Sequence, residues 1–193
     1  MIILVRHGQT FDNVKHVFQN KYSELTANGT KDAVVSGEEL LKYDIFDIIS
    51  SPYHRTLQTA HIIKKQYNWN KAIKVWDRLK ERNVGCYEQL PISEVIKKID
   101  FYDESFHPEN GENIKNFNCR VDNIWNEIVE YAEKKDIFKH NKALVIVTHG
   151  LVIHRILQHF FKCKIGRFDI KNGSLSIIKK NESDELYIDI KTK

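Results

Sequence analysis

Short runs of apolar residues alternate along the chain with segments whose apolar residues recur at helical spacing. The clearest run is residues 143–147, in which five apolar residues follow one another without interruption. Runs of this length are typical of strands buried on both faces. The pattern predicts strands at residues 2–5, 45–49, 72–75, 143–147, 174–178 and 186–190.

The segments between these strands predict helices. Residues 113–134 form the longest one, because one stripe carries Ile114, Phe117, Val121, Ile124, Trp125 and Ile128. Further helices are predicted at residues 26–43, 52–67 and 150–161, with Thr26 as the cap of the first. Strands that alternate with helices indicate an α/β fold, here a three-layer α/β/α sandwich with a mostly parallel sheet and helices on both faces.

Polar residues directly follow three of the predicted strands. In parallel α/β sheets the carboxyl ends of the strands meet at one edge, where ligands bind. We therefore expect one rim of the sheet to collect Arg6-His7-Gly8, Ser50-Ser51-Pro52 and Thr148-His149-Gly150.

Composition and charge narrow the class of protein. The 193 residues suit a single domain, residues 1–193. Lys and Arg total 30 against 26 Asp and Glu, a net charge of +4 without the one-sign blocks of a nucleic-acid binder. The three cysteines are far apart and lack metal-ligand spacing, so we expect no disulfide framework, no metal and no cofactor. Without a signal peptide or a long apolar run, a cytoplasmic protein is expected.

The residue types at the three strand exits suit a phosphoryl group. One arginine side chain can bind two phosphate oxygens at once, and the N-terminus of a helix offers backbone N–H donors. An imidazole can attack phosphorus. Phosphoryl transfer asks mainly for positioning and for cations around the equatorial oxygens. Two arginines and two histidines can supply both without a metal, which leaves only an acid for the leaving alkoxide to be found.

Four separated motifs resemble those of the histidine phosphatase superfamily, the clan of phosphoglycerate mutases and related acid phosphatases. The first is residues 4–10, Leu-Val-Arg-His-Gly-Gln-Thr, and the second is residues 51–60, Ser-Pro-Tyr-His-Arg-Thr-Leu-Gln-Thr-Ala. The acid segment is Leu79-Lys80-Glu81, and the last motif is Val147-Thr148-His149-Gly150. Gly111-Glu112 with Arg120 is similar to the middle helix of the family, and the resemblance spans about residues 1–175.

The resemblance implies a role for individual residues. His7 would be the nucleophile that forms a phosphohistidine, with Arg6, Arg55 and His149 holding the phosphoryl oxygens. Glu81 would protonate the leaving group and then activate water. The substrate-binding residues expected around them are Asn13, Gln19, Thr10 and Gly150. We also expect the positive charges of Arg6 and Arg55 to lower the pKa of His7.

Departures from the mutase pattern favour the phosphatase branch. Mutases carry an insertion with paired arginines before the middle helix, whereas residues 88–111 here contain no Arg. Residues 81–85 read Glu-Arg-Asn-Val-Gly and lack the His and Tyr of mutases, and Leu151 replaces a mutase Asn. The leading prediction is a metal-independent phosphomonoesterase for a small phosphorylated metabolite. The alternatives are a 2,3-bisphosphoglycerate-dependent phosphoglycerate mutase and a non-catalytic relative that binds phosphorylated ligands.

The other histidines and the lysine pairs are expected to have structural roles. His54, His61, His154 and His159 are expected on helices as surface or packing residues, and the lysine pairs as solvated faces. Residues 91–112 are expected to form a lid that influences which substrate binds. The expected partners are a phosphorylated small molecule and, at most, a second copy of the chain in a homodimer, with no nucleic acid and no membrane.

Overall fold

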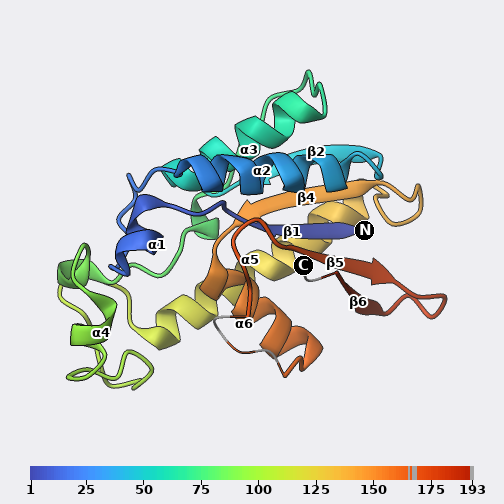
Figure 1. The fold of residues 1–193 in the computed structure, drawn as a ribbon. Helices are drawn as coiled ribbons and strands as arrows, with labels where there is room; N and C mark the ends of the chain where they lie inside the picture. The colour runs from blue at the N-terminus through green and yellow to red at the C-terminus, as the bar shows by residue number, and fades with distance from the viewer. Residues whose placement is uncertain (165, 167–168, 192–193) are drawn as a thin grey trace.

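Six strands form one mixed sheet in the order β3-β2-β4-β1-β5-β6 (Figure 1). The computed structural model describes residues 1–164, 166 and 169–191. The first four strands of that order run parallel, and the last two are added by antiparallel pairing. The strands are β1 (Ile2–Arg6), β2 (Ile45–Ser50), β3 (Lys74–Val75), β4 (Ala143–Thr148), β5 (Leu175–Lys180) and β6 (Leu186–Lys191).

Two pairs of helices cover the two faces of this sheet, as Figure 1 shows. Ile3 and Val5 of β1 share one core cluster with Leu40 and Ile63, which belong to α2 (Ala27–Leu40) and α3 (His54–Gln66). Ile2 and Leu4 point to the other face and share a second cluster with α5 (Ile114–Lys134) and α6 (Gly150–Phe161). The alternation along β1 thus builds a three-layer α/β/α sandwich, which confirms the predicted fold class.

Several boundaries differ from those that the sequence predicts. A short helix, α1 (Phe11–Lys15), follows β1 and was not expected, since five residues are too few to show a period. The third strand is only two residues long, and α2 ends at Leu40 instead of reaching residue 43. Short turns of helix occupy the loops between β3 and α5, namely η1 (Asp77–Leu79), η2 (Gly85–Tyr87) and α4 (Ile92–Val95).

The strand register brings the three polar exits together. Arg6 of β1 lies opposite Thr148 of β4, and Ser50 of β2 lies opposite Val147. The backbone N–H of His7 donates to the carbonyl of Thr148 at 3.1 Å, and that of Ser51 to Val147 at 3.0 Å. The residues that follow these strands therefore lie at one edge of the sheet, as predicted.

Residues 91–112 and the loop before them form a small apolar cluster of their own. Val84, Val95 and Phe101 are buried there, and Phe18 and Phe106 pack against them. This segment, with α4, lies at the end of the molecule toward which β4 points (Figure 1). No helix in the described part of the chain is long and apolar enough to cross a membrane.

Candidate active site

His7 is buried at the end of β1 with its ring fixed by two hydrogen bonds. Its Nδ1 lies 2.8 Å from the carbonyl oxygen of Gly8, and its Nε2 accepts from Nε of Arg55 at 3.3 Å. A carbonyl oxygen can only accept, so Nδ1 carries the proton. Nε2 therefore carries no proton, and its lone pair accepts from Arg55; an unprotonated nitrogen is what an imidazole nucleophile requires.

The two arginines approach this ring from different elements. Arg55, in the first turn of α3, is 1% exposed, and its Nη1 donates to the carbonyl of Asn20 at 2.8 Å. Arg6, at the end of β1, donates through Nη1 to the carbonyl of Ile170 at 2.5 Å. Nε of Arg6 is buried and has no hydrogen-bond partner among the described residues. A buried donor without a partner is costly, so this atom is suited to an anionic ligand.

His149 stands beside His7, with 5.5 Å between the ring centroids. Its Nε2 lies 2.8 Å from Oγ of Ser51, whereas its Nδ1 is buried without a partner among the described residues. His149 caps α6, so backbone N–H groups at the start of that helix lie next to the ring. Gly150, the first residue of α6, lies next to Arg6: a Cβ there would be 3.4 Å from Nε of Arg6, an ordinary van der Waals contact.

Burial and neighbouring cations set the protonation states of this group. The pKa of His7 is held well below 6.5, first by burial and then by the charges of Arg55 and Arg6. Burial and Arg55 lower the pKa of His149 in the same way. Burial lowers the pKa of Arg55 only to about 10, so this guanidinium stays charged at neutral pH. The expected influence of the arginines on His7 is present, but burial is the larger cause.

Glu81 lies in the loop after η1 and faces the same region. Its Oε1 accepts from the backbone N–H of Arg82 at 3.0 Å, and its Oε2 accepts from that of Leu151 at 3.2 Å. Burial raises the pKa of Glu81, although Arg55 and both N–H donors oppose that shift. A raised pKa favours the protonated acid at higher pH, which is the form that a proton donor needs.

Two of the expected substrate-binding residues, Thr10 and Asn13, serve the local fold. Thr10 and Asn13 form the capping box of α1, in which each side chain bonds the backbone of the other. All the side-chain hydrogen bonds described for Asn13 use its Oδ1. Gln19 differs, because its Oε1 is buried without a partner among the described residues.

Asn172 holds the backbone of His7 and was missed by the sequence interpretation. Its Nδ2 donates to the carbonyl oxygen of His7 at 2.9 Å, just before β5. The next residue, Gly173, has a φ of +69° and donates to the carbonyl oxygen of Arg6 at 3.1 Å. An Asn-Gly dipeptide is a recognised turn signal, and it was the one feature that could have drawn attention to this segment.

A close backbone contact fixes the loop after His7. A Cβ added to Gly8 would lie 2.1 Å from the carbonyl oxygen of Gly29, and one added to Gly29 would lie 1.9 Å from that of Gln9. Both positions therefore require glycine so that α2 can pack against this loop. Thr59 of α3 accepts from the N–H of Gly8 at 3.1 Å and adds a second support.

Comparison with known proteins identifies the family of this chain. Residues 2–188 match the histidine phosphatase superfamily (branch 1). The chain belongs to this superfamily. It is 32% identical over 161 residues to the broad-specificity phosphatase YOR283W of Saccharomyces cerevisiae, covering 81% of this chain and 68% of that protein. It is 30% identical over 200 residues to a 2,3-bisphosphoglycerate-dependent phosphoglycerate mutase of Buchnera aphidicola, covering 83% of each.

Solved structures agree on the fold of this superfamily member. A mycobacterial glucosyl-3-phosphoglycerate phosphatase superposes with a TM-score of 0.78 at 22% identity and covers 98% of this chain and 96% of its own. Bacillus stearothermophilus YhfR gives a TM-score of 0.78 at 24% identity, covering 98% of this chain and 95% of its own. The predicted phosphoglycerate mutase-like fold is thereby confirmed.

Proposed function

We propose that the protein is a phosphomonoesterase that hydrolyses a small phosphorylated metabolite through a phosphohistidine on His7, without a metal. The hydrogen bonding of His7 carries this proposal, because it leaves Nε2 unprotonated beside Arg55. Family membership and relatives named as phosphatases support the reaction class.

In the first half-reaction, Nε2 of His7 attacks phosphorus as the ester P–O bond breaks. Arg6, Arg55 and the free Nδ1 of His149 stabilise the oxygens of the transferred group. Ser51 donates to Nε2 of His149 in this scheme, which keeps a proton on Nδ1 for a phosphoryl oxygen. Glu81 gives its proton to the leaving alkoxide.

In the second half-reaction, the Glu81 carboxylate takes a proton from water. The water oxygen attacks phosphorus, and the N–P bond breaks. Inorganic phosphate leaves, the lone pair returns to Nε2 of His7, and Glu81 is protonated again. One carboxylate thus serves as acid and then as base.

The mutase alternative has a weaker basis in the residues of the chain. A mutase must grip a phosphoglycerate carboxylate in two orientations, and residues 88–111 offer no Arg for this purpose. Arg82, which precedes this segment in the chain, donates to the carbonyl oxygens of Glu112 at 2.9 Å and Phe101 at 2.5 Å. It is thus engaged in holding the segment. Residues 91–112 act as the lid in this proposal, and Gln19 lines the substrate mouth.

The proposal also includes the partners and the cellular location that the sequence predicts. The substrate is the partner that the site calls for, and a homodimer is compatible with it. We place the enzyme in the cytoplasm and expect no membrane as a ligand, on the apolar runs described above. We expect no nucleic acid, on the charge pattern.

The discriminating experiment treats the purified protein with a chelator and assays two reactions side by side. One is hydrolysis of a panel of phosphomonoesters, and the other is interconversion of 3-phosphoglycerate with a bisphosphoglycerate primer. Hydrolysis without interconversion is the expected result. Interconversion as the faster reaction would establish the mutase, and silence in both would leave a phospho-ligand binder.

A further inference from the structure

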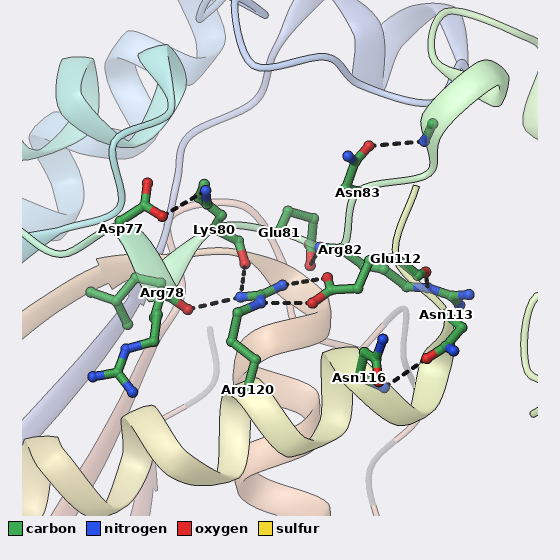
Figure 2. Close-up of polar contacts among 12 residues, drawn as sticks. Asp77, Arg78, Lys80, Glu81, Arg82, Asn83, Glu112, Asn113, Asn116 and Arg120 are labelled. Carbon is green, nitrogen blue, oxygen red and sulfur yellow. Dashed lines mark hydrogen bonds and ion pairs between the residues drawn. The ribbon is translucent and has the colours of Figure 1, made fainter. Parts of the chain in front are cut away.

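Arg120 joins α5 to the loop that carries Glu81. Figure 2 shows its guanidinium between the carboxylate of Glu112 and the backbone of residues 78–80. Nε and Nη2 donate to the two carboxylate oxygens of Glu112 at 2.8 and 2.6 Å. Nη1 donates to the carbonyl oxygens of Arg78 and Lys80, each at 2.8 Å.

These contacts leave Arg120 little capacity to bind a ligand. Four of its five N–H donors are used within the protein, and both partner carbonyls belong to the three residues that precede Glu81. A bidentate arginine–carboxylate pair fixes orientation as well as distance. The geometry is that of a clamp on the backbone.

Glu112 holds the other side of the same loop. Its backbone N–H donates to the carbonyl of Asn83 at 2.8 Å, and its carbonyl oxygen accepts from Nε of Arg82 at 2.9 Å. The residues immediately before and after Glu81 are thus tied to one pair, Arg120 and Glu112. Among the described residues, the Glu81 carboxylate accepts hydrogen bonds from two backbone N–H groups.

We propose that Arg120 and Glu112 are positioning residues that hold Glu81 where it can protonate the leaving group. The inference rests on the proposed function, since it needs Glu81 to act as the acid. Loosening the clamp lets the Glu81 carboxyl drift from the leaving oxygen, while His7, Arg6 and Arg55 stay fixed by other elements. The clamp therefore affects proton donation and leaves the attack on phosphorus intact.

The test compares leaving groups in Arg120→Met and Arg120→Lys. Alkyl phosphates need a proton on the departing oxygen, whereas p-nitrophenyl phosphate releases a phenolate that leaves without one. The measured quantity is kcat/KM, which reports formation of the phosphoenzyme, for p-nitrophenyl phosphate and for the fastest alkyl phosphate of a panel. We expect Arg120→Met to lose roughly 10- to 100-fold on the alkyl phosphate, part of the contribution of a general acid, and only a few-fold on p-nitrophenyl phosphate.

Arg120→Lys keeps a cation opposite Glu112, so folding is at less risk. One ammonium cannot bond both carboxylate oxygens and both carbonyls, so we expect the same split between substrates at a smaller size. Arg155→Met is the matched control. Arg155 makes an equivalent bidentate pair with Asp122, at 2.9 and 2.6 Å, and no hydrogen bond from either side chain to residues 78–83 is described. We expect it to leave the ratio of the two kcat/KM values at the wild-type level.

Each outcome separates the clamp from the proposed function. A wild-type protein that hydrolyses no alkyl phosphate would refute the function itself. An active wild type with Arg120 variants that lose the same factor on both substrates, or lose nothing on either, would overturn the positioning role. A change of the ratio in Arg155→Met as large as that in Arg120→Met would also overturn it.

Discussion

In the proposed mechanism, the phosphate side of the site is built on the sheet, whereas the leaving-group side, with Glu81, is carried by loops. His7, Arg55 and His149 are 2%, 1% and 0% exposed, and each directly follows a strand or lies in the first turn of a core helix. Glu81 and residues 91–112 lie between β3 and α5, a region that has a small cluster of its own with three buried apolar side chains, Val84, Val95 and Phe101. The chemistry shared by all substrates is thus placed in the most constrained region. The part that meets the variable leaving group is placed where sequence changes disturb the core least.

The largest effect should come from removing the nucleophile on the phosphate side. We expect His7→Ala to lower kcat by on the order of 10⁴-fold or more, because it removes the nitrogen that attacks phosphorus in the proposed mechanism. The measurement is hydrolysis of p-nitrophenyl phosphate, for which the acid is not needed. The control is His61→Ala, which removes an exposed imidazole from α3 and should keep wild-type activity.

Glu81→Gln should impair the leaving-group side of the site and spare the phosphate side. For alkyl phosphates we expect kcat/KM to fall by roughly 10²- to 10⁴-fold, the usual contribution of a general acid. For p-nitrophenyl phosphate we expect kcat/KM to be nearly retained, while slow dephosphorylation lets phosphoenzyme accumulate. Equal losses on both substrates would place Glu81 outside proton donation.

The pH dependence sharpens this comparison. Attack requires neutral His7, whose lowered pKa keeps it neutral at pH values well below 6.5. Proton donation requires protonated Glu81, whose raised pKa extends the acid form above 4.5. On alkyl phosphates kcat/KM should therefore be high at acid pH and fall as the pH rises through the pKa of Glu81. This fall should be absent in Glu81→Gln, measured from pH 4 to 8.

Two glycines of α2 test how tightly the phosphate side is packed. In Gly29→Ala the new Cβ would lie 1.9 Å from a backbone oxygen, so we expect a loss of about 3 kcal/mol in the free energy of unfolding and lower activity. Gly37→Ala places its Cβ 3.0 Å from the Cβ of Gln66, a much milder contact that a shift of a few tenths of an ångström between α2 and α3 relieves. We expect that variant to stay within about 1 kcal/mol of the wild type, since alanine also favours the helix. Urea unfolding of both variants gives the comparison, and equal stabilities would contradict it.

The smallest global effect should come from the lid. Phe101→Ala empties a cluster separate from the main core, so we expect a loss of less than about 1 kcal/mol in global stability. Proteolysis or amide exchange within residues 91–112 should nevertheless become faster. Phe117→Ala is the matched control in the main core, where about 3–5 kcal/mol should be lost. A global loss of that size in Phe101→Ala would mean that the lid and the core unfold together.

The difference between the sheet and the loops also explains which features could be predicted from the sequence. β4 and its exit were predictable because a strand buried on both faces reads as an unbroken apolar run, and its exit carries His149. α1 was not, since its five residues are defined by a capping box. Asn172 lies 165 residues from His7 in the chain, and nothing local links the two. The carbonyl groups that Arg120 contacts lie 42 and 40 residues before it in the chain, so its clamp on the acid loop was visible only in the structure.

The most direct test of the account is to trap the intermediate. Wild-type and Glu81→Gln proteins are mixed with p-nitrophenyl phosphate, quenched under alkaline conditions that preserve phosphohistidine, digested and analysed by mass spectrometry. We predict one phosphoryl group on the peptide that contains His7, present in larger amount in Glu81→Gln and absent in His7→Ala. A phosphoryl group on another residue, or an adduct that persists in His7→Ala, would contradict the assignment of His7 as the nucleophile.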